Sequence, residues 1–165
     1  MRIAIAQLNY HIGNFEGNLA RMQTAVEEAR GQNADLICFA ELAVCGYPPR
    51  DFLEFKDFIR LCDETVAELA KSSNGIGIIV GSPTPNPVIE GKDLFNSAFF
   101  LYDGEISHVQ HKTLLPTYDV FDEYRYFEPG SEYSVVEFRG KRIALSICEN
   151  LWNLGKENPL YTICP

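Results

Sequence analysis

The chain has 165 residues, of which 46% are hydrophobic and 22% are charged, a balance typical of one folded α/β domain rather than of a disordered chain. Its 14 basic and 23 acidic residues give a formal net charge of −9. This charge argues against nucleic acid and anionic membrane surfaces as partners, because both bind clustered lysine and arginine. Small molecules are therefore the expected ligands.

The start of the chain predicts a cytoplasmic protein. Residues 1–6 run directly into a strand-like pattern without a signal-peptide cleavage site, and no apolar stretch is long enough to span a bilayer. The five cysteines are odd in number and irregularly spaced, which fits free thiols in a reducing compartment better than a disulfide framework. They are Cys38, Cys45, Cys62, Cys148 and Cys164.

The first half of the chain alternates strand and helix patterns. Isoleucines alternate with alanines near the start, and apolar residues later recur every three or four positions, as on one face of a helix. In chain order these patterns predict a strand over residues 2–9, a helix over 15–30, a strand over 34–40, a helix over 58–70 and a strand over 76–81.

The second half of the chain contains paired strands and an aromatic loop. A proline-rich surface loop is expected over residues 82–87, and an irregular aromatic segment follows Lys112. Two turn signals, Asp103-Gly104 and Arg139-Gly140, each separate two apolar runs and predict hairpins. The paired strands are expected over residues 94–102 with 106–112, and over residues 135–138 with 141–147.

Three of the predicted strands end at reactive side chains, Glu41, Lys112 and Cys148. Residues 141–147 have apolar or small residues on both faces, which predicts an interior parallel strand with Cys148 at its carboxyl end, where ligands bind in open α/β sheets. Each residue also has a structural interpretation: Cys148 as a small buried hydrophobe, Glu41 as a solvent-facing strand end, and Lys112 as a surface lysine with a buried stem.

Together, an acid, an ammonium and a thiol can hydrolyse an amide through a thioester. The thiolate of Cys148 is the nucleophile, and a nearby cation lowers the pKa of the thiol. The Glu41 carboxylate takes the thiol proton and later activates water, while Lys112 and the backbone N–H of Glu149 stabilise the oxyanion. We expect the strands that end at Glu41 and Cys148 to be neighbours, with Lys112 at the same rim of the sheet.

No metal site is expected from the sequence. His108 and His111 are three residues apart on a predicted strand, so their side chains lie on opposite faces.

Three stretches of the sequence contain Glu41, Lys112 and Cys148 in this order: Ala34–Leu42, His111–Pro116 and Leu145–Trp152. They resemble the three motifs of the nitrilase superfamily of carbon–nitrogen hydrolases, whose catalytic triad has the same order. This resemblance implies an αββα sandwich and a hydrolase that needs no cofactor or metal for this reaction.

Two further stretches, residues 46–51 and 112–127, resemble the glutaminase domain of glutamine-dependent NAD synthetases. This narrower resemblance implies that Tyr47 and Tyr118 line a glutamine pocket and that Glu123 is a second acid supporting the triad. It also implies a homo-oligomer in contact with a synthetase domain, which would bind ATP and Mg²⁺.

The family's domain is longer than this chain, so we expect residues 1–165 to be a partial glutaminase domain, truncated at the C-terminus and without the synthetase domain. The leading hypothesis is a glutamine amidohydrolase segment whose ammonia amidates deamido-NAD. One alternative keeps the chemistry but takes another small amide, nitrile or carbamoyl compound. A second alternative is a non-catalytic fragment in which an open sheet edge binds a partner chain.

Overall fold

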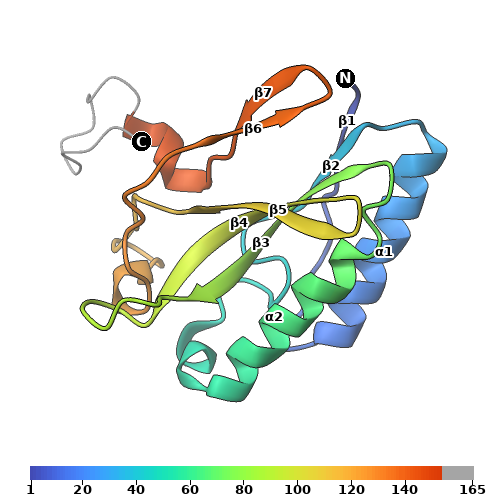
Figure 1. The fold of residues 1–165 in the computed structure, drawn as a ribbon. Helices are drawn as coiled ribbons and strands as arrows, with labels where there is room; N and C mark the ends of the chain where they lie inside the picture. The colour runs from blue at the N-terminus through green and yellow to red at the C-terminus, as the bar shows by residue number, and fades with distance from the viewer. Residues whose placement is uncertain (154–165) are drawn as a thin grey trace.

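A five-stranded mixed sheet forms the centre of the molecule. A computed structural model describes residues 1–153 of the protein (Figure 1). The strands are ordered β1 (Ile3–Ile5), β2 (Leu36–Cys38), β3 (Gly77–Pro85), β4 (Leu94–Tyr102) and β5 (Glu105–His111). β1, β2 and β3 are parallel, whereas β4 runs antiparallel to both β3 and β5.

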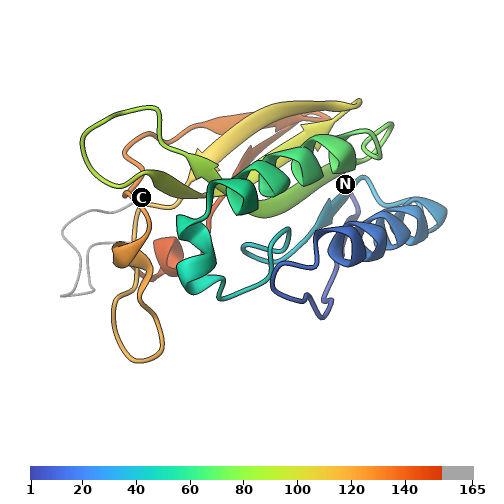
Figure 2. The same ribbon diagram turned by 90° about the horizontal axis from the view of Figure 1, so that it is seen from below.

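Two helices cover one face of this sheet (Figure 2). They are α1 (Phe15–Gly31), which the Asn14 side chain caps by accepting from the Gly17 N–H, and α2 (Lys56–Ala70). Apolar side chains spaced three or four residues apart, such as Met22 and Val26 on α1, are fully buried against the sheet in the larger hydrophobic cluster. The predicted helices are therefore confirmed, with α2 beginning two residues earlier than expected.

A separate two-stranded hairpin, β6 (Val135–Phe138) and β7 (Lys141–Ala144), packs on the opposite face. Its Phe138 ring meets Phe100 of β4 edge to face at 5.3 Å, within a second hydrophobic cluster that also contains Leu145 and Ile147. Three short 3₁₀ helices complete the described structure: η1 (Arg50–Glu54), η2 (Glu123–Arg125) and η3 (Cys148–Asn153). The α/β fold class is thus confirmed, with a sheet covered on both faces.

Both predicted hairpins are present because their turns have the required backbone chemistry. Asp103 and Gly104 have φ values of 51° and 85°, and Arg139 and Gly140 have φ values of 47° and 70°. Two successive positive φ angles match the twist of paired antiparallel strands, and glycine or aspartate adopts them more readily than most residues.

The interior parallel strand predicted over residues 141–147 is wrong. β7 ends at Ala144, pairs with β6 in a sheet of its own, and leaves Lys141 and Arg142 exposed. β2 lies between β1 and β3, so Glu41 and Cys148 do not follow neighbouring strands. The alternating isoleucine and leucine side chains had a simpler explanation: an antiparallel hairpin buries one face and leaves the other in water.

The surface loop predicted over residues 82–87 is wrong in its first part, because β3 continues through Pro85. Ser82 is fully buried, and residues 78–85 pair with β4. β2 pairs only with Gly77–Ile79, so the two prolines lie at an edge position where no N–H is needed for a second partner strand. The first two strands are shorter than predicted, because pairing is confined to three residues in each.

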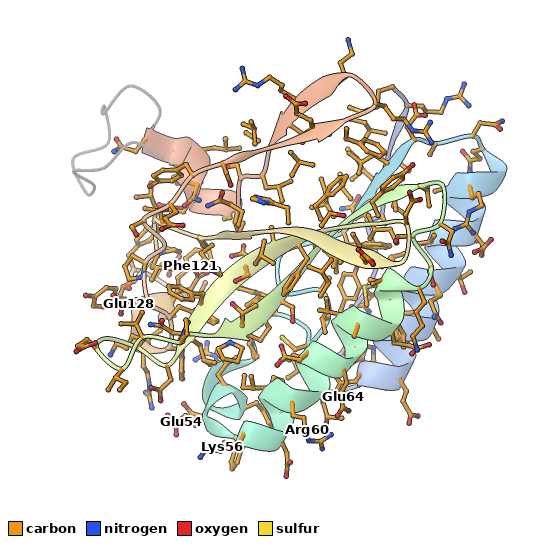
Figure 3. The ribbon with its side chains drawn as sticks, viewed as in Figure 1. Glu54, Lys56, Arg60, Glu64, Phe121 and Glu128 are labelled. Carbon is orange, nitrogen blue, oxygen red and sulfur yellow. The ribbon has the colours of Figure 1, made fainter. Side chains whose placement is uncertain are left out.

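The outer face of α2 carries charged pairs. Arg60 donates to Glu64 one turn away at 2.7 Å, and both side chains are more than half exposed (Figure 3). Among the described residues, no helix combines the length and apolar character needed to cross a membrane.

Candidate active site

Strand direction brings the predicted site residues to one end of the sheet. β2 and β5 both run toward this end, and Glu41 and Lys112 lie on the segments that leave them. The antiparallel strand β4 starts here, and the carbonyl oxygen of its third residue, Asn96, accepts the Lys112 backbone N–H at 2.8 Å. Phe121 and Glu128 lie at the same end, on the aromatic segment that follows β5 (Figure 3).

The Lys112 ammonium is buried between two carboxylates. Its Nζ lies 2.7 Å from Glu41 Oε1, and 3.0 and 2.8 Å from the two carboxylate oxygens of Glu123. Lys112 is fully buried, and Glu123 is 5% exposed. Burial by itself lowers the pKa of Lys112, but the two carboxylates outweigh it and raise this pKa above its ordinary value. The lysine therefore keeps its proton near neutral pH. The interpretation of Lys112 as a surface residue is wrong.

Glu41 lies in a tight turn just after β2, and Gly81 of β3 makes room for that turn. A Cβ atom at Gly81 would lie 2.3 Å from the backbone nitrogen of Leu42 and 2.9 Å from the carbonyl oxygen of Ala40. The Gly81 carbonyl also accepts the Val44 N–H at 3.2 Å. The close approach of the two backbones fixes the direction in which the Glu41 side chain, 19% exposed, leaves the sheet.

Glu123 is held on two sides. Besides Lys112, it accepts a hydrogen bond from the Tyr47 hydroxyl at 3.1 Å. Burial raises the pKa of Glu123, Lys112 opposes this effect, and the Glu41 charge adds to it, so that the pKa ends above its ordinary value. Burial and the two carboxylates also raise the pKa of Tyr47, which therefore stays a hydrogen-bond donor.

Cys148 opens η3 and is exposed, so it is not the buried hydrophobe of the structural interpretation. Its φ of 44° is rare for a residue with a side chain and turns the chain sharply as it leaves Ile147. Partial burial raises the pKa of the Cys148 thiol, Lys112 lowers it, and the charges of Glu41 and Glu123 raise it further. The predicted lowering by the cation operates, but the net shift is upward.

Hydrogen bonds join the Cys148 turn to the segment after Lys112. Asn150 Oδ1 accepts the backbone N–H groups of Thr113 and Leu114 at 3.0 and 2.8 Å. The Tyr118 hydroxyl donates to Glu149 Oε1 at 2.8 Å, and this bond, together with burial, raises the pKa of Tyr118 to about 12. These bonds tie the segment that begins at Cys148 to the segment that follows Lys112, although the two segments leave different sheets.

Residues 2–154 match the family model for carbon–nitrogen hydrolases, which is almost the whole chain. The chain belongs to the carbon–nitrogen hydrolase family. The resemblance seen in the sequence is therefore confirmed.

Relatives of this carbon–nitrogen hydrolase include longer proteins. The chain is 43% identical over 155 residues to a glutamine-dependent NAD(+) synthetase from Synechocystis sp., covering 92% of this chain and 28% of the relative. It is 37% identical over 153 residues to the protein of the same name from Thermotoga maritima, covering 93% of this chain and 26% of the relative. The chain thus spans a little over a quarter of the length of these relatives.

Solved structures agree with this relationship. A glutamine-dependent NAD+ synthetase from Acinetobacter baumannii superimposes with a TM-score of 0.84 at 36% identity, covering 91% of this chain and 28% of that one. An amidase from Nesterenkonia sp. has a TM-score of 0.77 at 22% identity, covering 92% of this chain and 56% of that one, a likeness of fold alone. The nitrilase-like fold class is therefore confirmed.

Sequence reasoning missed three residues of this hydrolase site: Gly81, Asn96 and Asn150. Asn96 Nδ2 donates to Glu41 Oε1 at 2.7 Å and lies 3.5 Å from Glu123 Oε2. One signal was available, since Asn96 and Ser97 are polar residues in a strand whose other members are apolar or aromatic. Gly81 and Asn150 act through contacts with distant segments, which leave no local pattern in the sequence.

The two histidines of β5 have separate partners. His111 Nδ1 lies 2.8 Å from Ser97 Oγ, and His108 Nε2 lies 3.2 Å from Ser134 Oγ. Within residues 1–153, no three His, Cys, Asp or Glu side chains are grouped so that they could hold a metal ion.

Proposed function

We propose that this carbon–nitrogen hydrolase region hydrolyses the side-chain amide of L-glutamine within a glutamine-dependent NAD synthetase. The observation that carries the proposal is the buried Lys112 ammonium between Glu41 and Glu123, whose field reaches the exposed Cys148 thiol. The names of the relatives support glutamine as the substrate, because both curated relatives are glutamine-dependent.

The first step forms a thioester. The pKa of the Cys148 thiol is raised, so at neutral pH the thiol keeps its proton until a base removes it. Glu41 takes this proton as the sulfur attacks the carboxamide carbon. Negative charge then develops on the former carbonyl oxygen, where the Lys112 ammonium and the Glu149 backbone N–H stabilise it. Glu123 holds Lys112 in place from the other side.

The second half of the reaction restores the thiol. Glu41 returns its proton to the amide nitrogen, the C–N bond breaks, and ammonia leaves. The glutamyl group stays bound to the sulfur as a thioester. Glu41 then removes a proton from water, which attacks the thioester carbon. The C–S bond breaks, Glu41 gives this proton to the sulfur, and glutamate is released.

The surrounding residues fit a small polar substrate. Tyr47 and Tyr118 are 39% and 36% exposed, and each donates its hydroxyl to an acid of the site, so we assign them to the glutamine pocket.

In the longer protein, ATP and Mg²⁺ would act in the synthetase region, which amidates deamido-NAD with the ammonia. A cytoplasmic location fits the free thiols among the described residues. The homo-oligomer stays a prediction that light scattering can test.

The test uses the intact gene product and measures glutamate and ammonia release. We expect L-glutamine to be turned over faster than asparagine, other ω-amides and N-carbamoyl compounds, and Cys148→Ser to abolish the reaction. Ammonia-supported NAD formation should survive in Cys148→Ser, which separates lost glutaminase chemistry from misfolding. Glutamine turnover that persists in Cys148→Ser would contradict the proposal. Faster turnover of another amide would keep the chemistry and replace the substrate.

A further inference from the structure

Asn96 is a buried amide aimed at both carboxylates of the site. It is fully buried near the start of β4, and its Nδ2 lies 2.7 Å from Glu41 Oε1 and 3.5 Å from Glu123 Oε2. Its backbone carbonyl accepts the Lys112 backbone N–H. The same residue therefore contacts the backbone of the lysine and the carboxylates around its ammonium group. Its Oδ1 is buried without a hydrogen-bond partner among the described residues.

The orientation of this amide follows from the charges around it. Turning the amide over would aim Oδ1 at Glu41 and Glu123, and an oxygen acceptor facing two carboxylates is repelled. A buried Oδ1 without a partner costs free energy. The contacts of Nδ2 with the two carboxylates must therefore stabilise the site by more than this cost. The two carboxylates, rather than packing within β4, therefore determine the orientation of the Asn96 amide.

The two carboxylate oxygens of Glu41 are consequently not equivalent. Oε1 accepts from both Lys112 Nζ and Asn96 Nδ2, each at 2.7 Å. A proton placed on Oε1 would face two donors, so a proton taken up by this carboxyl group belongs on Oε2. With the proton on Oε2, both hydrogen bonds to Oε1 are kept, and the side chain need not turn between its charged and neutral forms.

We propose that Asn96 is a positioning residue that reserves Oε2 of Glu41 as the atom that accepts and returns the proton. Asn96 acts through Glu41 and touches no reacting atom. The inference rests on the proposed function for the role of Glu41 as the base. The proton balance is simple: Cys148 loses a proton to Oε2, and Oε2 gives it to the departing nitrogen.

The test compares two variants in the intact gene product. Asn96→Asp keeps the shape but replaces the donors with a third carboxylate beside Glu41, so we expect kcat near neutral pH to fall by about 100-fold or more. Asn96→Ala removes the donors without adding charge, and about tenfold is expected. In both variants the acid limb of the kcat/KM profile should move to higher pH, because the ionised carboxylates lose hydrogen bonds, while KM changes by less than about threefold.

Ser73 provides a control. It is also a fully buried polar residue, but its hydroxyl bonds to the backbone of Ala70 and Gly104, at the end of the sheet opposite to the acids. Ser73→Ala should lower the melting temperature and leave the acid limb where the unmodified protein has it. An acid limb that does not move in Asn96→Asp and Asn96→Ala, or that moves equally in Ser73→Ala, would overturn the proposal.

A second readout does not depend on the substrate. The rate of Cys148 alkylation by iodoacetamide reports the electrostatic environment of the thiol, and the added carboxylate in Asn96→Asp should shift this rate profile to higher pH. If the intact protein does not turn over glutamine but the alkylation profile shifts as expected, the proposed function fails and the placement of Asn96 against the charged cluster stands. An unshifted alkylation profile in Asn96→Asp counts against the placement itself.

Discussion

The two halves of the candidate site are held in different ways. The charged half, Glu41, Lys112 and Glu123, is anchored to the five-stranded sheet and closes around a fully buried ammonium. The nucleophilic half is an exposed thiol on a turn that leaves a separate hairpin. Hydrogen bonds of Asn150 and Tyr118 tie this turn to the segment that follows Lys112.

The charged half contributes more to the stability of the site than the thiol half. A buried cation between two acids is stable only while all three are present, because removing one leaves an unpaired charge out of water. An exposed thiol on a turn can be altered with little loss of stability, since few buried contacts depend on it. Changes in the charged half should therefore alter folding and chemistry together, and changes in the thiol half mainly chemistry.

Replacing Lys112 should have the largest effect. Lys112→Met leaves Glu41 and Glu123 without their shared cation, so we expect the free energy of unfolding to fall by about 3–5 kcal/mol and glutaminase activity to be lost. Arg60→Met is the matched control, because Arg60 is half exposed in its pair with Glu64 and should change stability by less than about 1 kcal/mol. Urea denaturation measures both. Equal losses would contradict the contrast between the two pairs.

Gly81→Ala should come next. The new Cβ would lie too close to the turn that carries Glu41, and overpacking of this kind costs about 1–3 kcal/mol. Activity should fall with stability, because the turn must shift. Gly31→Ala, with no atom within 4 Å of its Cβ at the end of α1, should instead be neutral or stabilise by about 0.5–1 kcal/mol. Thermal melts compare the two; a harmless Gly81→Ala would show that the backbones are not in close contact.

Asn150→Ala tests the tie between the two halves. It leaves the buried N–H groups of Thr113 and Leu114 without their acceptor, which costs about 1–3 kcal/mol, and it frees the Cys148 turn. We expect kcat to fall more than stability alone explains. Asn150→Asp keeps an acceptor oxygen and should retain more activity. Steady-state kinetics at a temperature far below unfolding measures the difference, and equal activity of Asn150→Ala and the unmodified protein would mean that the tie is dispensable.

The pH dependence of thiol labelling gives the smallest but most specific effect. Cys148 is exposed whereas Cys45 and Cys62 are fully buried, so brief alkylation should label Cys148 first among the described cysteines. Because the thiol pKa lies above its ordinary value of 9.0, the rate should still be rising beyond pH 9. Lys112→Met removes a cation that lowers this pKa and should shift the profile to higher pH, whereas Glu41→Gln removes a negative charge and should shift it to lower pH. Shifts in the same direction would contradict this account of the electrostatics.

Local chemistry explains what the sequence predicted correctly. The hairpins follow from adjacent turn residues, and α1 follows from a period of three to four residues. The meeting of Glu41 and Lys112 at one end of the sheet follows from their position just after two strands that run in the same direction. Glu41, Lys112 and Cys148 were candidates because each follows a predicted strand. Their order along the chain then matched a known family.

Contacts between distant segments explain what the sequence did not predict. The apolar pattern of residues 141–147 fits both a strand of the main sheet and a strand of a separate hairpin. Pairing with β6 places residues 141–144 in the separate hairpin. The prolines after Gly81 suggested a loop. That stretch instead continues β3 and pairs with β4 on one side, while β2 does not extend along its other side. Asn96 meets Glu41 from 55 residues away, and Asn150 meets Thr113 from 37 residues away. The predictions for Cys164 and for the residues after Asn153 lie outside the described part of the chain.

Trapping the covalent intermediate tests most directly whether Cys148 is the nucleophile. The intact gene product is mixed with L-glutamine, quenched in acid within one turnover, digested and analysed by mass spectrometry. We expect a glutamyl thioester on the peptide that contains Cys148. It should be absent from Cys148→Ser and reduced in Glu41→Gln, which lacks the base that starts the reaction. A glutamyl group on a different residue, or turnover of glutamine with no covalent adduct in single-turnover conditions, would contradict this role of Cys148.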